Sequence, residues 1–500
     1  MAKSASTARR LKLMRVGLVS GDGLPVSGLM TIFRNVVELG QSMGILEVPV
    51  PADLGFSWRP DKPTFFPSGN DTVVYPDWMS VADCPTAVCL DSVTFARELV
   101  AIRDGVARLS LLSMLEKKRL NSRITDLAAV YYEHFTSWLK SSEVDWVFAL
   151  NMTLSDAVPA TVALHNAIRD HFSDGRRGGI LFWDHDLFQS CAIRDPDSGT
   201  RIYPEKPNEC TPLPRRNSFT RWVVVSDALA KETTCYPTDL SPEVVPNILP
   251  AVPVGTLEAR HWEYVRHLEL DLRRPILLNP VRVFRVKGVH IAIELLAAMK
   301  AAAERRGFAI PYLLVFGSLQ EDPVYAQEVL ALACDLNILS DVRFLDGVPL
   351  TSYCEADRPW RLDEIDLLRL ATASCGGVVF TPSVPDVETV GLGPGLSALA
   401  GLPCAVTDYD AFERIYGPSF ICTRGGFGPD EVRKAGEELL NVLQGMKQQD
   451  VVLLERLKEN QRAMERRFPV ELWRNLWREM EVALLEGGKK DQRNSLYNSL

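Results

Sequence analysis

The sequence predicts an α/β protein built from two parallel sheets, each covered by helices. Short apolar runs recur along the 500 residues with helical patterns between them, and this alternation is typical of parallel strands joined by helical crossovers. The chain is longer than one hydrophobic core usually supports, so we expect two domains. A hydrophobic content of 46% and a charged content of 24% are ordinary for a globular protein.

The expected strands fall into two series. The first series comprises residues 16–20, 88–91, 144–150, 180–183 and 222–226. The second series comprises residues 276–278, 312–316, 342–345, 378–380 and 405–407. Residues 246–275, rich in proline near their start, separate the two series and are the expected connection between the domains.

Bulk properties exclude several kinds of function. The formal net charge of −9 argues against nucleic-acid binding and against strong attachment to an anionic membrane. No apolar run approaches the length of a membrane span, and the first residues lack the apolar core of a secretory signal. The ten cysteines include no Cys-x-x-Cys pair, which favours free thiols in a reducing compartment. We therefore expect a cytoplasmic protein without stable membrane insertion; these features do not set its oligomeric state.

The loop 279–288 carries two cations between an expected strand and an expected helix. Arg282 and Lys287 both lie in it. The start of the helix adds free backbone N–H groups and the positive end of the helix dipole. Arg supplies a planar donor fork and Lys a point charge, a combination suited to a diphosphate. Two solvated surface cations are the alternative, and Arg285 between them fits either interpretation.

A second loop of this kind, residues 381–395, follows the expected strand 378–380. It carries one carboxylate, Glu388, just before glycines that let the backbone approach a ligand closely. A cationic loop and a loop with a carboxylate and glycines, on two strands of one sheet, indicate a nucleotide-sugar site. The other candidate donor-binding residues of this loop are Ser383, Gly391, Leu392 and Gly393.

Both loops resemble the donor domain of the GT-B glycosyltransferases, specifically the retaining family 4 type. In that family an Arg and a Lys with four residues between them hold the donor diphosphate, and Arg282 and Lys287 have this spacing. The family's second signature is Glu-x7-Glu followed by small residues and Gly-x-Pro. Glu388 and residues 401–403 match this signature. The resemblance implies an α/β protein of GT-B fold, with two Rossmann-like domains whose parallel sheets face each other across a cleft.

The resemblance also implies how the chain is divided. The implied parts are an acceptor-side domain, 1–255, a donor-binding domain, 256–465, a terminal helix that crosses back to the first domain, 466–486, and a frayed tail, 487–500. Trp473 and Trp477 lie at helical spacing in the terminal helix. Such a pair is most often core packing, and here we expect it to anchor the helix.

The chain departs from the family signature at one position. Leu396 stands where the family has its second Glu, which usually holds the ribose hydroxyls. A hydrogen bond to a charged group is worth about 1.5–3 kcal/mol, so its loss would weaken donor binding about ten- to a hundredfold. We expect that the nucleoside is bound in an altered way; the alternative is that the chain is an inactive homologue.

The N-terminal half resembles the family in the same order. Residues 180–188 are similar to the His-Asp-Phe strand end of bacterial family 4 hexosyltransferases, in which the His faces the reacting sugar. The resemblance thus assigns His185 to sugar binding or proton handling, and Asp186 to the donor; a structural histidine is the alternative. Asp184, His185 and Asp186 alternate in direction along a strand, so they line one site only if the strand has ended. We reject a metal at this trio, because GT-B enzymes do not need one.

A Gly-rich turn, residues 20–28, follows the first expected strand. Its spacing is neither a dinucleotide fingerprint nor a Walker loop. The resemblance places Gly28 where backbone N–H groups reach the donor phosphate or the acceptor, and a purely structural turn is the alternative. Residues 244–247 are similar to the family's Val-Pro-Asn exit toward the second domain.

The resemblance implies an enzyme that transfers a hexose-like sugar from a nucleotide-diphosphate sugar to a small-molecule acceptor, with the configuration retained. The candidate catalytic residues are His185, Arg282, Lys287 and Glu388. A GDP-sugar is the first expectation, because family members with a Pro-x-Arg start often use one; no metal or other cofactor is expected. The alternatives are an antibiotic-pathway transferase with an unusual sugar or a non-hydroxyl acceptor, a non-catalytic GT-B partner subunit, and a sugar-nucleotide 2-epimerase.

Overall fold

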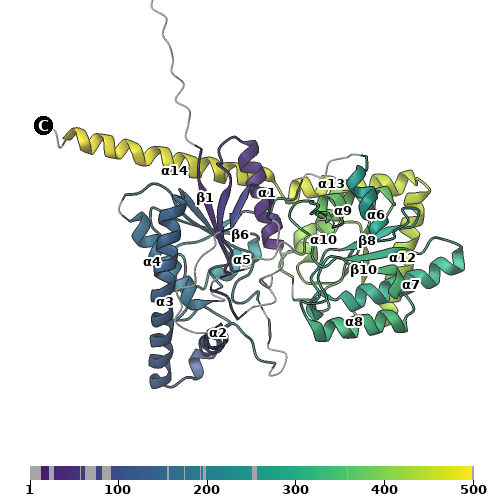
Figure 1. Ribbon diagram of the computed structural model, residues 1–500, viewed down its shortest axis with the longest axis horizontal. Helices are drawn as coiled ribbons and strands as arrows, with labels where there is room; N and C mark the ends of the chain where they lie inside the picture. The colour runs from purple at the N-terminus through teal and green to yellow at the C-terminus, as the bar shows by residue number, and fades with distance from the viewer. Residues whose placement is uncertain are drawn as a thin grey trace, which may run out of the picture.

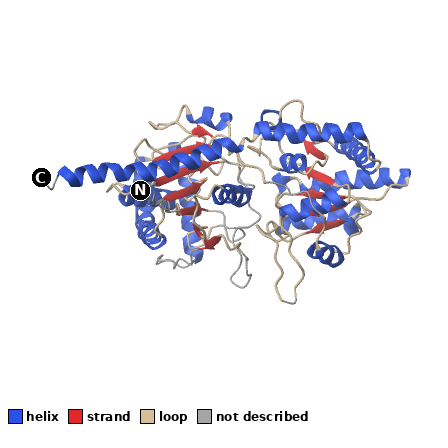
Figure 2. Cartoon of the chain, turned by 90° about the horizontal axis from the view of Figure 1, so that it is seen from above, coloured by secondary structure: helices blue, strands red, loops and turns tan. Residues whose placement is uncertain are grey.

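The chain forms two lobes, one from each half of the sequence (Figure 1). Each lobe has a central sheet with helices on both of its faces (Figure 2). The computed structural model describes residues 13–21, 28–56, 58–61, 75–81, 92–154, 157–173, 175–191, 193–194, 199–250, 256–356, 358–386 and 388–497.

The N-terminal sheet has seven parallel strands in the order β3-β2-β1-β4-β5-β6-β7. Their bounds are Val16–Ser20 (β1), Val50–Asp53 (β2), Met79–Val81 (β3), Trp146–Leu150 (β4), Gly179–Asp184 (β5), Thr220–Val224 (β6) and Glu243–Val244 (β7). Every residue of β1, β4 and β5 is buried, because helices cover both faces, and such strands read as continuous apolar runs. The predicted strand 88–91 lies outside the described residues.

The C-terminal sheet has six parallel strands in the order β10-β9-β8-β11-β12-β13. Their bounds are Ile276–Asn279 (β8), Tyr312–Val315 (β9), Val342–Phe344 (β10), Gly377–Phe380 (β11), Cys404–Thr407 (β12) and Thr423–Gly425 (β13). Five of these lie where apolar runs predicted strands. The sequence analysis missed β13, a three-residue edge strand that contains Arg424 and no apolar run.

Helices connect the strands in both lobes. In the N-terminal lobe they are Gly28–Ser42 (α1), Ser92–Ala107 (α2), Met114–Ser142 (α3), Val158–Phe172 (α4) and Asp227–Thr233 (α5). In the C-terminal half they are Ala259–His267 (α6), Val289–Arg306 (α7), Pro323–Asp335 (α8), Glu364–Ala373 (α9), Gly393–Leu399 (α10), Phe412–Tyr416 (α11), Pro429–Lys447 (α12), Val451–Arg467 (α13) and Val470–Tyr497 (α14). Within the described part of the chain, no helix is both long and apolar enough to span a membrane.

The two sheets share one topology. In each sheet the strand order reverses at the centre, between β1 and β4 and between β8 and β11. At such a switch point the neighbouring crossovers leave toward opposite faces, which opens a crevice beyond the carboxyl ends of the strands. The loop 279–288 follows β8 and the loop 381–395 follows β11. Both predicted loops therefore lie at the switch point of the C-terminal sheet.

The last helix, α14, returns to the N-terminal lobe and runs along it (Figure 1). Trp473 packs on Trp183 of β5, with ring centroids 4.5 Å apart, and Trp477 packs on Phe148 of β4 at 5.5 Å. The indole Nε1 of Trp473 donates a hydrogen bond of 2.9 Å to the carbonyl of Pro246. The two tryptophans thus seal one face of the N-terminal sheet.

The backbone of α14 continues into residues 487–500, the stretch predicted to be a frayed tail. The backbone of α14 is helical to Tyr497, although the stretch begins with two glycines and is polar. Extending an existing helix costs much less than starting one, so a helix nucleated by the buried tryptophans continues into a weakly helical sequence.

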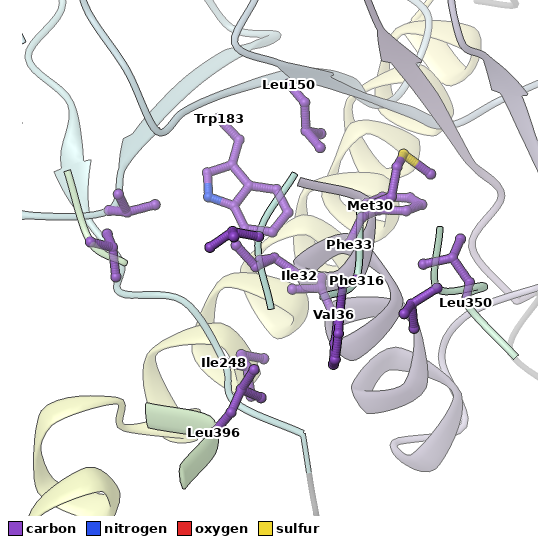
Figure 3. Packing of buried hydrophobic residues seen from close by; sticks show 14 of the residues in the cluster. Met30, Ile32, Phe33, Val36, Leu150, Trp183, Ile248, Phe316, Leu350 and Leu396 are labelled. Carbon is purple, nitrogen blue, oxygen red and sulfur yellow. The ribbon is translucent and has the colours of Figure 1, made fainter. Parts of the chain in front are cut away.

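The lobes meet along α1. The buried guanidinium of Arg34 donates to the carbonyl of Leu350 at 3.3 Å, and the amide of Asn35 donates to the carbonyl of Ile248 at 2.8 Å. Around these bonds, apolar side chains from both lobes pack together (Figure 3). The connection between the domains is therefore held by polar contacts as well as by apolar packing.

Candidate functional site

A cavity of about 1020 Å³ lies between the lobes, at the carboxyl ends of both sheets. Typical small-molecule sites have volumes of about 300–1,000 Å³, so this one accommodates a large ligand or two smaller ones. Every predicted site residue except Ser383 lines it, namely Gly28, His185, Asp186, Arg282, Lys287, Glu388, Gly391, Leu392 and Gly393. Tertiary folding thus brings together residues that lie far apart in the sequence.

The two loops of the C-terminal lobe are bonded to each other. Gly288 has φ of +67°, and a Cβ atom there would lie 1.8 Å from the carbonyl oxygen of Thr381. The hydroxyl of Thr381 donates to the carbonyl of Gly288 at 3.1 Å, and the amide of Ser383 donates to the carbonyl of Val286 at 3.0 Å. Only glycine fits this contact, so the sequence Lys-Gly at the helix start serves loop packing as well as chemistry.

Ser383 is the one predicted site residue that does not line the cavity. Its hydroxyl donates to the carbonyl of Arg285 at 2.8 Å, and its side chain does not line the cavity. A serine beside a loop backbone competes well for a nearby carbonyl. In the structure Ser383 therefore helps to join the two loops.

Lys287 and Glu388 are direct partners. The ammonium Nζ of Lys287 lies 2.6 Å from Oε1 of Glu388, with side chains 29% and 11% exposed. Asp186 reaches the same place from the N-terminal lobe, and its Oδ1 accepts a hydrogen bond from the hydroxyl of Thr389 at 3.4 Å. Burial raises the pKa of Asp186, and Glu388 raises it further, while Lys287 lowers it. Lys287 thus pairs with Glu388 and also stabilises the charged form of Asp186 from the other lobe.

Arg282 is oriented by a buried carboxylate. Its Nε lies 3.3 Å from Oε1 of Glu321, whose other oxygen accepts the backbone amide of Val283 at 2.5 Å. Burial raises the pKa of Glu321, and the charge of Arg282 opposes that shift. The guanidinium also lies over the ring of Phe284, 4.9 Å from its centroid. The sequence analysis did not single out Glu321, which follows the next strand along the chain without a recognisable motif.

Arg285 is among the residues that line the cavity. Its guanidinium pairs with Glu328, and both side chains are at least half exposed. It also lies over the ring of Tyr325, 5.1 Å from the centroid. These contacts favour the solvated, structural interpretation of Arg285 over a third phosphate contact.

The trio Asp184, His185 and Asp186 divides at the strand end. The strand β5 ends at Asp184, which is fully buried and accepts bonds from the amide of Thr153 at 3.3 Å and the indole of Trp222 at 2.7 Å. Burial raises the pKa of Asp184 to about 7. His185 and Asp186 lie beyond the strand, where alternation no longer applies, and both line the cavity. Asp184 is therefore a core residue, and the other two belong to the site.

His185 is neutral near pH 7. It is 5% exposed, and burial lowers its pKa to about 4. Its Nε2 lies 3.0 Å from Oδ1 of Asn247, in the segment that leaves the N-terminal sheet. A general acid or base works best when its pKa is near the operating pH. Burial and the lowered pKa therefore favour sugar binding over proton handling for this residue.

The glycines of the second loop are shaped by two tyrosines. Gly391 has φ of +68°, and a Cβ there would lie 2.7 Å from the hydroxyl of Tyr409. The carbonyl of Gly391 accepts bonds from Tyr409 and Tyr416. Leu392 and Gly393 follow at the start of α10. Because the two tyrosine hydroxyls bond to the carbonyl of Gly391, the turn is fixed at the cavity wall.

Gly28 and Leu396 complete the predicted set. Gly28 begins α1 and lines the cavity, while residues 22–27 of the predicted turn lie outside the described residues. Leu396 is 4% exposed and lies beside Ile248 (Figure 3). The position of the family's second carboxylate is thus occupied by an apolar side chain packed at the interface of the lobes.

The sequence analysis missed a charged pair in the cavity wall. Arg34 of α1 and Glu364 of α9 come from different lobes, lie 3.6 Å apart, and have side chains only 5% and 12% exposed. Burial raises the pKa of Glu364, and Arg34 opposes that shift. Charged residues inside a helical pattern ordinarily lie on its solvated face, so the sequence contained no signal that these two would meet.

Comparison with known proteins supports the fold. No family model and no curated protein matches the chain. Sucrose-phosphate synthase from Thermosynechococcus elongatus matches with a TM-score of 0.54 and 13% identity over 97% of this chain and 100% of that one. An α,α-trehalose-phosphate synthase (UDP-forming) from Burkholderia vietnamiensis gives 0.53 and 12% over 93% and 96%. Anabaena HepE, in complex with UDP and glucose, gives 0.51 and 13% over 93% and 98%.

These matches confirm the predicted fold class. The chain has the GT-B fold of the glycosyltransferases, with two Rossmann-like domains whose parallel sheets face each other across a cleft. Sequence identities this low describe a shared architecture, and activity resides in individual residues of a site. The function therefore has to be argued from the cavity.

Proposed function

We propose that the chain is a glycosyltransferase that moves a hexose-like sugar from a nucleotide-diphosphate sugar to a small-molecule acceptor. The contact that carries this proposal is the 2.6 Å pair of Lys287 and Glu388 in the cavity between the lobes. By the family resemblance, the lysine holds the donor diphosphate and the glutamate holds the sugar. The pair puts these two functions on neighbouring atoms, as a sugar–phosphate bond requires.

The electrostatics of the C-terminal wall suit the departure of a diphosphate. When the bond between the anomeric carbon and the phosphate oxygen breaks, negative charge grows on the leaving phosphate. Lys287 and Arg282, with the amides at Gly391–Gly393, would stabilise this charge from fixed positions, the most effective form of electrostatic catalysis. Glu321 keeps Arg282 in place. Closure of the two lobes would exclude water.

We infer that the anomeric configuration is retained, as the family resemblance implies. In this scheme the acceptor hydroxyl forms the new bond to the anomeric carbon and gives its proton to an oxygen of the leaving phosphate. His185, which is neutral near pH 7, and Glu388 would hold sugar hydroxyls during the transfer. We propose that the reaction takes place in the cytoplasm and without a metal ion. Activity that survives a chelator would support the absence of a metal.

The nucleoside is the least constrained part of the donor. A GDP-sugar is our first proposal from the sequence, whereas HepE was solved with UDP and glucose. Leu396 offers no hydrogen bond to a ribose. A thermal-shift screen against GDP-, UDP-, ADP- and TDP-sugars tests the choice, because a ligand that binds the folded state raises the apparent melting temperature.

The activity itself is tested by hydrolysis and transfer assays on variants. Lys287→Met should lower donor turnover by about 10²- to 10³-fold, the usual effect of removing one group that stabilises developing charge. Arg285→Met is the matched control, since its surface partner is Glu328, and it should stay within about twofold of wild type. Equal losses in both variants, or none in either, would contradict the assignment of Lys287.

One alternative keeps a specific observation in its favour. Leu396 stands where the family resemblance implies a ribose-binding carboxylate and is packed beside Ile248, and such a loss would be expected in a partner subunit without catalysis. Tight binding of a nucleotide sugar without hydrolysis or transfer would support that alternative. An isomer formed from the donor without any acceptor would instead indicate an epimerase.

A further inference from the structure

We propose that Asn151 is a positioning residue, which holds the turn at His185 and Asp186 so that both present hydrogen-bond acceptors to the hydroxyl groups of a sugar ligand. This inference rests on the proposed function, since it assigns a task to one wall of the same cavity. Asn151 itself lines the cavity at the end of β4.

The carboxamide of Asn151 bonds the turn at three points. Its Oδ1 accepts the backbone amide of His185 at 2.7 Å and that of Asp186 at 3.3 Å. Its Nδ2 donates to Oδ2 of Asp186 at 3.1 Å. The turn comes directly after β5 and has left the strand ladder, so these bonds replace the pairing that the next strand would have supplied.

The backbone of Asn151 is adapted to this role. Its φ is +51°, in the left-handed region that few residues other than Gly, Asn and Asp adopt. Its amide donates to the carbonyl of Trp183 at 3.0 Å. Leu150, the residue before Asn151, is paired in register with Trp183 of β5, and the two side chains lie close together in Figure 3. The left-handed residue therefore ends β4 and directs its side chain across the neighbouring strand end.

A second asparagine holds the imidazole of His185. Oδ1 of Asn247, itself buried, accepts a hydrogen bond from Nε2 at 3.0 Å, which places the imidazole proton on that nitrogen. Nδ1 then carries a lone pair. Among the described residues this buried Nδ1 has no hydrogen-bond partner, although buried polar atoms are usually paired.

The chemistry of this wall matches a polyhydroxylated ligand. A neutral imidazole nitrogen and a carboxylate, side by side, accept hydrogen bonds and donate none. Asp186 already accepts a bond from the hydroxyl of Thr389, on the other lobe. A sugar hydroxyl is the kind of group that would satisfy Nδ1 of His185 and share Asp186. Asn151 sets the spacing of the two acceptors and thereby selects the positions of the hydroxyls.

Asn151→Gly tests the assignment with its backbone effect controlled. Glycine keeps the left-handed conformation and removes all three side-chain bonds. Turnover should fall by up to about a hundredfold, as expected for misplaced contacts, with a modest fall in melting temperature, since each lost hydrogen bond is worth about 1 kcal/mol. Asn337→Gly is the matched control, because Asn337 also has a positive φ of +54° but is exposed and lies away from the cavity. It should keep wild-type turnover.

Asn151→Asp separates positioning from simple loss of structure. The introduced carboxylate still accepts the two backbone amides, but it repels Asp186 unless it is protonated. The activity of this variant relative to wild type should therefore rise as the pH falls. A constant ratio across the pH range would contradict the donor role of the Asn151 amide.

Nitrogen NMR of histidine-labelled protein tests the inference without any turnover. In the wild type, the His185 signal, assigned by its loss in His185→Gln, should show a neutral ring protonated at Nε2 at pH 7. In Asn151→Gly the signal should move or broaden, and in Asn337→Gly it should not. Unchanged His185 signals and unchanged turnover in Asn151→Gly would overturn the inference. If the wild type neither binds nor cleaves a nucleotide sugar, the proposed function fails. The positioning role of Asn151 is then tested by the NMR signal of His185 alone.

Discussion

The two lobes have one topology and two different chemistries. Both sheets reverse their strand order at the centre, and both present that switch point to the same cavity. The C-terminal lobe supplies charged groups from its loops, Arg282, Lys287 and Glu388. Beside the buried Arg34, the N-terminal lobe supplies a neutral histidine and the shielded carboxylate of Asp186. A shared scaffold thus sets where a ligand lies, and the loop residues set which part of the ligand each lobe can hold.

The lobes also differ in how they are completed. The C-terminal sheet is covered by helices of its own half of the chain. The N-terminal sheet depends on α14, whose two tryptophans lie against β4 and β5. A helix from the far end of the chain therefore contributes to the wall on which Asn151 and His185 lie. This dependence makes the N-terminal lobe the more vulnerable of the two.

The largest effect is expected from Trp473→Ala. The side chain is 1% exposed, and truncating a buried tryptophan typically costs about 3–5 kcal/mol of unfolding free energy. The loss should be concentrated in the N-terminal lobe, so hydrogen exchange of β4 and β5 should increase more than that of β8 and β11. Trp262→Ala is the control, because Trp262 is 51% exposed on α6 of the other lobe. Equal destabilisation by both substitutions would refute the dependence on α14.

A smaller effect is expected from Gly288→Ala in the C-terminal lobe. The new methyl group would meet the carbonyl of Thr381 at 1.8 Å in a left-handed backbone, so we expect a loss of about 3 kcal/mol. Gly307→Ala shares the positive φ, +65°, but its Cβ would have no neighbour within 4 Å, and it should cost about 1 kcal/mol. Urea denaturation of both variants measures the difference. Similar losses would show that the contact between the two loops contributes nothing.

The smallest effect concerns the pH dependence of the N-terminal core. The pKa of Asp184 is raised from 3.8 to about 7 by burial, so the folded state keeps a proton that the unfolded state has released. Its contribution to stability is complete below pH 4 and is lost as the pH rises through 7. Asp184→Asn removes this titration. The stability of the variant relative to wild type should increase by about 1 kcal/mol from pH 5.5 to 6.5.

Other titrating groups do not obscure that comparison. Burial lowers the pKa of His165 and of His185 to about 4, so their stabilisation is present above pH 6.5 and is lost as the pH falls through 4. Both histidines are present in wild type and variant, and their effects cancel in the difference. Denaturation curves at several pH values therefore isolate Asp184, and a difference that does not vary with pH would contradict its raised pKa.

The success of the strand predictions followed burial. The central strands β1, β4 and β5 are buried along their whole length, so each appears in the sequence as an unbroken apolar run. The edge strands β3 and β7 have three and two residues, partly exposed, and β2 contains Pro51. A strand this short, or interrupted by proline, leaves no pattern that distinguishes it from a loop.

The two loops of the candidate site lie close together for a different reason. Residues that follow parallel strands meet at one edge of the sheet, so the sequence predicts that the loops of Lys287 and Glu388 lie close together. Their direct contact confirms that proximity; their roles in catalysis are still predictions. Ser383 lies in the predicted loop, but its hydroxyl is turned to the carbonyl of Arg285 and it does not line the cavity. Side-chain direction inside a loop is not encoded by spacing.

Local sequence was enough to specify the class of fold and the two charged loops that meet at the C-terminal sheet, since these follow from burial patterns and from chain direction in parallel sheets. Folding in three dimensions alone decided the partners: Arg34 with Glu364, Asn151 with the turn at His185, and α14 with the first sheet. Such contacts join segments hundreds or tens of residues apart. Their free energy depends on distances and burial that no stretch of sequence contains by itself.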